Sequence, residues 1–135
     1  MPKIASQKQE EQCSVDYAFQ RIGGKYKARI LWHLSHGTKR YGELKRHLRD
    51  ITPKMLTQAL RELETDQLIT RHVYLEVPPR VEYSLDITGR ELVPAIELLS
   101  GWARLQMKKR NIPVMAFSLP VSNRTDAPHP AAVPL

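Results

Sequence analysis

The chain of 135 residues predicts a mainly α-helical domain that carries one small β-hairpin. Two observations on apolar spacing predict this fold class. From residue 13 to 67, and again from residue 88 to 110, apolar residues recur three and four positions apart, which is the spacing of an amphipathic helix. Between residues 71 and 85 the spacing becomes an alternation, which is typical of strands. The length suits one domain with its own hydrophobic core.

The charge balance indicates an acidic polymer as partner. The net charge is +7, and residues 13–110 hold 18 Lys and Arg against 11 Asp and Glu, so the excess lies within the expected domain. No long apolar run predicts a membrane segment, and the N-terminus lacks the apolar core of a signal peptide, so a cytoplasmic protein is expected. A single cysteine excludes an internal disulfide and a Cys-rich zinc site.

Two helices and a connector are expected before residue 41. Residues 1–12 are polar and are expected to form a flexible N-terminal arm. A first helix should start at Cys13 and stop at Gly23-Gly24, with apolar residues at helical spacing between them. A second helix should end near Gly37, and residues 38–40 are interpreted as a short connector. In the first helix the residues at helical spacing are Val15, Ala18, Phe19 and Ile22, and the expected inner face of the second is Ile30, Leu31 and Leu34.

A helix-turn-helix pattern comes next. Residues 41–48 predict a short helix with Leu44 and Leu48 on one face. A stronger helix follows over residues 52–67, because Thr52 is a good N-cap and Pro53 suits the first helical position. Its apolar stripe is Leu56, Ala59, Leu60 and Leu63. A short helix, a turn and a capped second helix together form the pattern.

A β-hairpin and a last long helix complete the domain. Residues 71–77 and 81–85 should be its strands, joined by a stiff cationic turn at Pro78-Pro79-Arg80. Thr88 is expected to cap the last helix in a capping box with Glu91. Pro94 should kink this helix or postpone its regular start. Beyond residue 110 the chain carries five of its ten prolines, so residues 111–135 are expected to form a flexible tail.

The order of these elements predicts a winged helix-turn-helix domain over residues 13–110 that binds double-stranded DNA. In such a domain the second helix of the pair enters the major groove, and the hairpin, or wing, lies beside it. Its polar face is expected to read bases through Lys54, Thr57, Gln58 and Arg61. Thr52, Tyr41, Lys39 and Arg40 are expected to hold phosphates, and Arg80 to lie over the minor groove. The alternative for each of these side chains is plain solvation.

The sequence resembles the HxlR-type winged-helix transcriptional regulators, which are MarR-like in architecture. The resemblance covers roughly residues 13–105 and is densest in the stretch Glu-Val-Pro-Pro-Arg-Val-Glu-Tyr-Ser-Leu over residues 76–85. Further matches are Ile22-Gly23-Gly24-Lys25-Tyr26, Tyr41-Gly42-Glu43-Leu44 and Ile51-Thr52-Pro53-Lys54-Met55-Leu56. The resemblance implies a bacterial homodimer on pseudo-palindromic operator DNA, in which the first and last helices form the interface. From these observations together we expect a transcriptional repressor. The interface residues expected here are Val15, Phe19, Leu98, Trp102 and Leu105.

The resemblance also implies a role for the cysteine before the first helix, since some members sense thiol-reactive compounds through it. Cys13 occupies that place, where a helix N-terminus favours the thiolate. The alternative is a small hydrophobe without chemistry. Three departures stand out: Ser14 replaces a frequent proline, Tyr26 stands where tryptophan is usual, and the chain has no second cysteine for a two-cysteine switch.

Other functions find less support in the sequence. Trp32, Trp102 and Phe19 could line an effector pocket, although core or dimer contacts are favoured. The histidines show no metal-ligand grouping, and no cofactor is expected. No phosphate loop, nucleophile elbow or carboxylate pair indicates an enzyme. A less selective nucleic-acid-binding module, or a protein-interaction winged helix without redox sensing, stays open as the alternative function.

Overall fold

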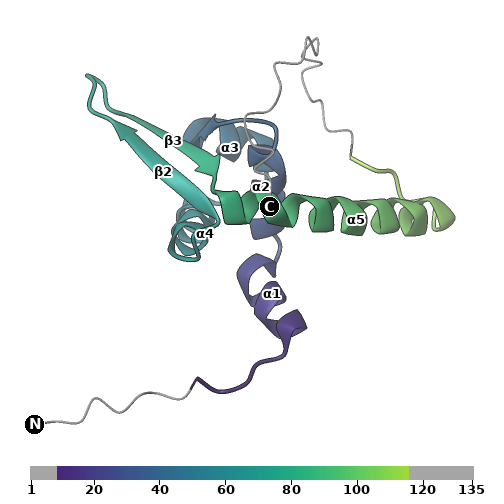
Figure 1. The fold of residues 1–135 in the computed structure, drawn as a ribbon. Helices are drawn as coiled ribbons and strands as arrows, with labels where there is room; N and C mark the ends of the chain where they lie inside the picture. Colours follow the sequence, from purple (N-terminus) through teal and green to yellow (C-terminus); the bar gives the residue numbers. More distant parts are fainter. Residues whose placement is uncertain (1–8, 116–135) are drawn as a thin grey trace, which may run out of the picture.

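The computed structural model describes residues 9–115, in which helices flank a small antiparallel sheet (Figure 1). This is the predicted fold class, mainly α with a β-hairpin wing. The elements are α1 (Ser14–Ile22), α2 (Lys27–Leu34), β1 (Lys39–Arg40), α3 (Tyr41–Leu48), α4 (Pro53–Thr65), β2 (Ile69–Tyr74), β3 (Arg80–Leu85) and α5 (Ile87–Lys109). In Figure 1 the wing and the far half of α5 project from opposite sides of the body, and α1 stands below it.

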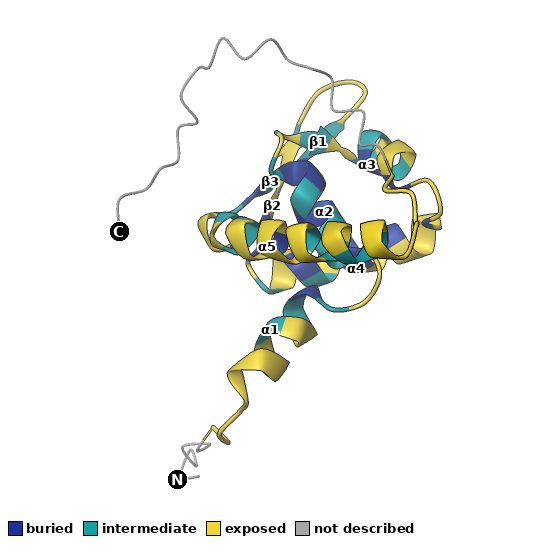
Figure 2. Ribbon diagram, turned by 90° about the vertical axis from the view of Figure 1, so that its right-hand side faces the viewer, coloured by how far each residue is buried: buried dark blue, intermediate teal, exposed yellow. Residues whose placement is uncertain are grey.

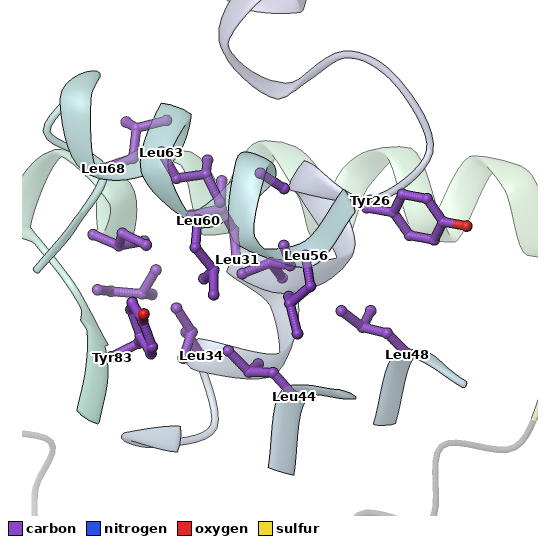
Figure 3. Packing of buried hydrophobic residues seen from close by; sticks show 14 of the residues in the cluster. Tyr26, Leu31, Leu34, Leu44, Leu48, Leu56, Leu60, Leu63, Leu68 and Tyr83 are labelled. Carbon is purple, nitrogen blue, oxygen red and sulfur yellow. The ribbon is translucent and has the colours of Figure 1, made fainter. Parts of the chain in front are cut away.

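The core lies where α2, α3 and α4 meet beneath the sheet (Figure 3). The inner faces predicted from helical spacing are the ones buried there. The completely buried side chains of these three helices are Ile30, Leu31, Leu44, Leu48, Leu56 and Leu63. Residues from three separate helices thus share one apolar cluster, and burying each large side chain contributes about 1.5–3 kcal/mol to folding. The cluster fixes α4 against α2 and α3.

The start of α4 is built as the sequence predicts. The Thr52 hydroxyl accepts a hydrogen bond from the Met55 backbone N–H at 3.2 Å, and Pro53 is the first helical residue. This N-cap satisfies one of the N–H groups that a helix start leaves without a partner.

The connector over residues 38–40 proves to contain a strand. Lys39–Arg40 forms β1, which pairs antiparallel with β3, so the sheet has the order β1-β3-β2. Lys39 lies opposite Tyr83, and Arg40 lies opposite Glu82. Two residues are too short to display an alternation, which is why the sequence shows no strand here.

The first strand of the hairpin is displaced from its predicted place. It runs from Ile69 to Tyr74, and its pairing with β3 ends at Tyr74 opposite Arg80. Leu75 and Val77, predicted to lie within the strand, are in the loop beyond the ladder and fully exposed. The strand begins early because Ile69 packs in the core beside Leu85, and it stops before the two prolines, which cannot donate ladder hydrogen bonds.

The start of the last helix was also predicted wrongly. α5 begins at Ile87, and its N-cap is Asp86, whose carboxylate accepts from the Ile87 N–H at 2.7 Å. Thr88 is therefore inside the helix and does not cap it. Pro94 lies within α5 and does not postpone its start. An interior proline removes one i→i−4 hydrogen bond and crowds the carbonyl four residues earlier, here that of Arg90, yet α5 runs without interruption from Ile87 to Lys109.

The ends of the described chain lie outside the helices and strands. Residues 9–13 and 111–115 are exposed, and the rest of the expected arm (1–12) and tail (111–135) lies outside the described residues. Figure 2 shows exposed residues along α1 and along the outer side of α5. Among residues 9–115, no helix is long and apolar enough to cross a membrane.

Candidate nucleic-acid interface

The outer face of α4 carries the four predicted base-reading residues in one stripe. Lys54, Thr57, Gln58 and Arg61 are spaced three and four positions apart, opposite the buried leucines of the same helix. Lys54, Gln58 and Arg61 are exposed, and Thr57 is half-buried. Among the ion pairs between described residues, none involves Lys54 or Arg61. Both cations therefore face solvent and can meet a polyanion.

Gln58 is oriented by a chain of polar contacts that ties α4 to α2. Its amide Nε2 donates to Glu62 Oε1 at 3.2 Å, and Glu62 Oε2 lies 2.6 Å from Lys27 Nζ. Lys27, followed by Gln58, lowers the pKa of the Glu62 carboxyl. The amide oxygen of Gln58 is not used in this contact and can accept a hydrogen bond from a base edge. The contact with Glu62 also limits the positions that the Gln58 side chain takes. This role of Glu62 could not be predicted from the sequence, because its partner Lys27 is far away in the chain.

The residues expected to hold phosphates divide into two kinds. Arg40 is exposed at the start of α3, and Lys39 beside it is half-buried in β1. Tyr41 instead donates its hydroxyl proton to the Pro53 carbonyl at 3.2 Å, which fixes α3 against the first turn of α4. The Thr52 hydroxyl is likewise engaged as the N-cap. Tyr41 and Thr52 thus position α4, whereas Lys39 and Arg40 offer charge.

A second polar cluster fixes the turn before α4. Asp50 forms ion pairs with Lys25 at 2.6 Å and Arg29 at 3.3 Å, and its backbone carbonyl accepts from the Tyr26 hydroxyl at 3.3 Å. Lys25, through its hydrogen bond, lowers the pKa of the Asp50 carboxyl. These contacts join the segment before α2 to the segment before α4. Their separation of more than twenty residues left no pattern by which the sequence could predict them.

Arg80 does not stand at the wing tip as a separate cation. It is the first residue of β3, and its guanidinium lies 3.5 Å from a Glu76 oxygen and 3.4 Å from a Glu82 oxygen. The guanidinium also stacks over the Tyr74 ring, 4.0 Å from the ring centre. The wing therefore has a different surface from the cationic tip that the sequence predicts.

Cys13 is exposed and is the N-cap residue of α1. Backbone N–H groups, that of Asp16 first and then that of Val15, lower the pKa of the Cys13 thiol. This is the effect expected from a helix N-terminus, and it increases the thiolate fraction near neutral pH.

Within residues 9–115, no group of three or more His, Cys, Asp or Glu residues could hold a metal ion.

The five residues expected at a dimer interface are all exposed in the single chain. Trp102 is 65% exposed, although its indole is a large apolar surface. The other four are Val15, Phe19, Leu98 and Leu105. Of the three residues considered for an effector pocket, Trp32 packs against the core, while Trp102 and Phe19 face solvent. The outer sides of α1 and α5 thus present apolar surface that the monomer does not cover.

Known proteins resemble the chain over this same domain. The HxlR-like helix-turn-helix family model matches residues 21–111. The HTH-type transcriptional regulator YtcD of Bacillus subtilis is 51% identical over 96 residues, which are 71% of this chain and 76% of YtcD. A crystal structure of YtcD superposes with a TM-score of 0.69 at 48% identity, covering 72% of this chain and 99% of that one.

Redox regulators are among the similar structures. The redox regulator HypR in its reduced form has a TM-score of 0.70 at 39% identity, over 73% of this chain and 98% of HypR. The transcriptional regulator YodB from B. subtilis, also in its reduced form, has a TM-score of 0.61 at 31% identity, over 69% of this chain and 92% of YodB. The relatives named here are all described as regulators. With its winged helix-turn-helix fold and its family match over residues 21–111, this chain belongs to the HxlR-like helix-turn-helix family of DNA-binding transcriptional regulators.

Proposed function

We propose that this protein is a homodimeric transcriptional repressor of a bacterial cytoplasm, and that it binds a pseudo-palindromic operator. The observation that carries the proposal is the stripe of Lys54, Thr57, Gln58 and Arg61 on the outer face of α4. A capped helix that is anchored by its buried face and cationic on the other suits the major groove. Arg61 and Lys54 would pair with guanine, and Gln58 with adenine.

Around this helix, phosphate contacts would set the register on the duplex. Lys39 and Arg40 supply charge at the start of α3, and Thr52 and Tyr41 hold the first turn of α4 in place. Phosphate contacts of this kind carry affinity and little sequence information. The wing would reach the adjacent minor groove.

Two copies of the chain would pair through α1 and α5. The support is the exposed apolar surface of Val15, Phe19, Leu98, Trp102 and Leu105. A two-fold dimer would carry two copies of α4 and would therefore recognise two inverted half-sites about one helical turn apart.

Cys13 would make the repressor responsive to thiol-reactive compounds. It is exposed, its pKa is lowered, and it lies at the start of α1, a proposed dimerisation helix. An electrophile that alkylates its thiolate would place a new group beside the dimer interface. The relatives HypR, a redox regulator, and YodB, studied in reduced and diamide-treated forms, support this reading. With one cysteine in the chain, the response would need no second thiol of the same chain.

The test is fluorescence anisotropy on the duplex upstream of the protein's own gene, and on a duplex selected from a random pool, across a salt series. Arg61→Ala should weaken binding by about fivefold or more, because an Arg–guanine pair is worth about 1–3 kcal/mol. Arg104→Ala, an exposed arginine on α5, is the matched control and should bind like wild type. Undiminished binding by Arg61→Ala would remove that residue from the interface. Equal affinity for selected and scrambled duplexes would favour the less selective module.

The role of Cys13 has its own test. Iodoacetamide should change the operator affinity of wild type and leave Cys13→Ser unaffected. If the alkylated protein binds like the untreated one, Cys13 is not a sensor.

A further inference from the structure

The tip of the wing is apolar and holds no cation. The loop between the paired strands is Leu75-Glu76-Val77-Pro78-Pro79, because the ladder closes at Tyr74 and Arg80. Leu75 is 97% exposed and Val77 is 102% exposed, and both prolines are exposed as well. Figure 1 shows this loop as the most outlying point of the wing. Four of the five tip residues therefore offer hydrocarbon to whatever the wing meets.

Arg80, the nearest cation, is held by the wing itself. It lies directly opposite Tyr74, so both side chains are on the outer face of the sheet, together with Glu82. Its guanidinium is between two carboxylates, at 3.5 Å from Glu76 and 3.4 Å from Glu82, and its side chain is only 29% exposed. The Tyr74 ring covers one side of it at 4.0 Å. A guanidinium in this setting neutralises carboxylates and has few directions left for a nucleic acid.

We propose that the wing contacts the minor groove through the apolar side chains of Leu75, Val77 and Pro78-Pro79, while Arg80 neutralises Glu76 and Glu82 without touching DNA. The proposal rests on the DNA-binding function proposed above and specifies how the wing takes part in it. DNA is the occupant because the wing is continuous with the α4 face, through the β2 strand that follows α4 directly. Minor-groove proteins frequently insert apolar side chains, Leu and Pro among them, between base steps.

The ion pairs have a purpose under this proposal. Two carboxylates near the tip would face the phosphates that line the groove, and uncompensated they would repel the duplex. Arg80 cancels part of that charge from within the wing and also braces the two strands at the place where their pairing ends. Arg80 is thus a positioning residue.

The first test removes the apolar tip. Leu75→Ser/Val77→Ser should lower affinity for the selected duplex roughly tenfold, with an unchanged slope of log Kd against log salt, since no charge is lost. Ile87→Ser, an exposed aliphatic residue at the start of α5, is the control and should bind like wild type. Leu75 and Val77 are both solvent-exposed, so the circular dichroism and thermal unfolding of the Leu75→Ser/Val77→Ser variant should match those of wild type. Wild-type affinity in the Leu75→Ser/Val77→Ser variant would overturn the proposal.

The second test separates neutralisation by Arg80 from direct contact. Arg80→Gln alone should weaken binding, because it leaves Glu76 and Glu82 uncompensated. The triple variant Arg80→Gln/Glu76→Gln/Glu82→Gln should regain affinity to within about twofold of wild type, because nothing remains to neutralise. If the triple variant stays as weak as Arg80→Gln, and its salt slope falls by about 0.9, Arg80 contacts DNA directly and the proposal is wrong.

A failure of the parent function is distinguishable from a failure of the wing proposal. If wild type binds no duplex at low salt, both are overturned together. If wild type binds and Arg61→Ala weakens it, α4 reads DNA, and the wing variants then decide the wing proposal alone.

Discussion

The one buried histidine of the described chain couples its stability to pH. His33 is 5% exposed, and its ring stacks on that of His47 with the ring centres 5.1 Å apart. Burial lowers the pKa of His33 from 6.5 to about 4, and the nearby charges of His47, Arg29, His36 and Lys39 add to this effect. A proton on His33 is thus held more weakly by the folded chain than by the unfolded one.

The sign of the pH effect follows from these two values. Between pH 4 and 6.5 the unfolded chain binds more protons at this site, so the free energy of unfolding rises with pH. The contribution of neutral His33 to the free energy of unfolding is fully present above pH 6.5, and about 3 kcal/mol of that contribution is lost by pH 4. Urea titrations at several pH values give the free energy of unfolding as a function of pH. Between pH 4 and 6.5 this dependence should be weaker in the His33→Gln variant than in wild type, whereas a variant of the exposed His36, His36→Gln, should keep it. Identical slopes in wild type and His33→Gln would refute the assignment.

Cys13 allows a second prediction from a single residue. Because the N–H groups of Asp16 and Val15 lower its pKa, the rate of alkylation by iodoacetamide should level off at a lower pH in the folded protein than in urea. The folding of α1 supplies these N–H groups, so unfolding should restore the ordinary thiol pKa. The same inflection in both states would mean that the helix start does not act on the sulfur.

Among the elements, the helices could be predicted from the sequence and the edges of the sheet could not. Helices α3 and α4 were predicted because Leu44, Leu48, Leu56 and Leu63 keep the helical period and all become core. The exposed stripe of α4 followed from the same period. The ion pairs of Arg80 with Glu76 and Glu82 were missed, because they depend on where β2 and β3 stop pairing, and the pairing ends at Tyr74 and Arg80, before the two prolines. Contacts across long separations, such as Lys27 with Glu62, leave no local pattern.

The start of α5 depends on a close approach between two segments. Gly89 is buried, and a Cβ placed on it would lie 2.0 Å from the Leu68 carbonyl oxygen. The Leu68 carbonyl also accepts a hydrogen bond from the Asp86 N–H at 3.0 Å. Moving either segment to make room for the Cβ would therefore weaken this hydrogen bond. Gly89→Ala should therefore lower the free energy of unfolding by about 1–3 kcal/mol through overpacking. A thermal or urea unfolding curve would measure the loss.

A matched glycine in another helix should behave in the opposite way. Gly42 is near the start of α3, and no atom lies within 4 Å of the Cβ that Gly42→Ala would add. Alanine there should leave stability unchanged or raise it by about 0.5 kcal/mol, because it lowers the conformational entropy of the unfolded chain. Similar effects of the two substitutions would contradict the close packing of α5 on residue 68.

At the scale of the whole molecule, the fold separates the elements proposed to read DNA from the helix face proposed to pair two copies. Helices α3 and α4 and the wing gather on one side, and α5 extends away from them (Figure 1). The core ties α2 to both halves, because Ile30 and Leu31 are in the cluster that also holds Leu56 of α4 and Ile96 of α5. A change in how two copies pair would thus alter the spacing of their α4 helices without changing either reading surface.

This arrangement predicts that loss of pairing and loss of operator affinity go together. Leu98→Glu/Trp102→Glu places two charges in the apolar surface of α5, which is exposed in the single chain. If α5 pairs two copies, burial of these charges costs more than the contact gains, and sedimentation should show a monomer. The monomer reaches one half-site only, so its affinity for the full operator should fall at least about tenfold.

The control is Leu75→Ser/Val77→Ser, in which the changed residues are also exposed but lie on the wing, and it should remain dimeric. A Leu98→Glu/Trp102→Glu variant that still sediments as a dimer would place the pairing surface elsewhere than on this face of α5.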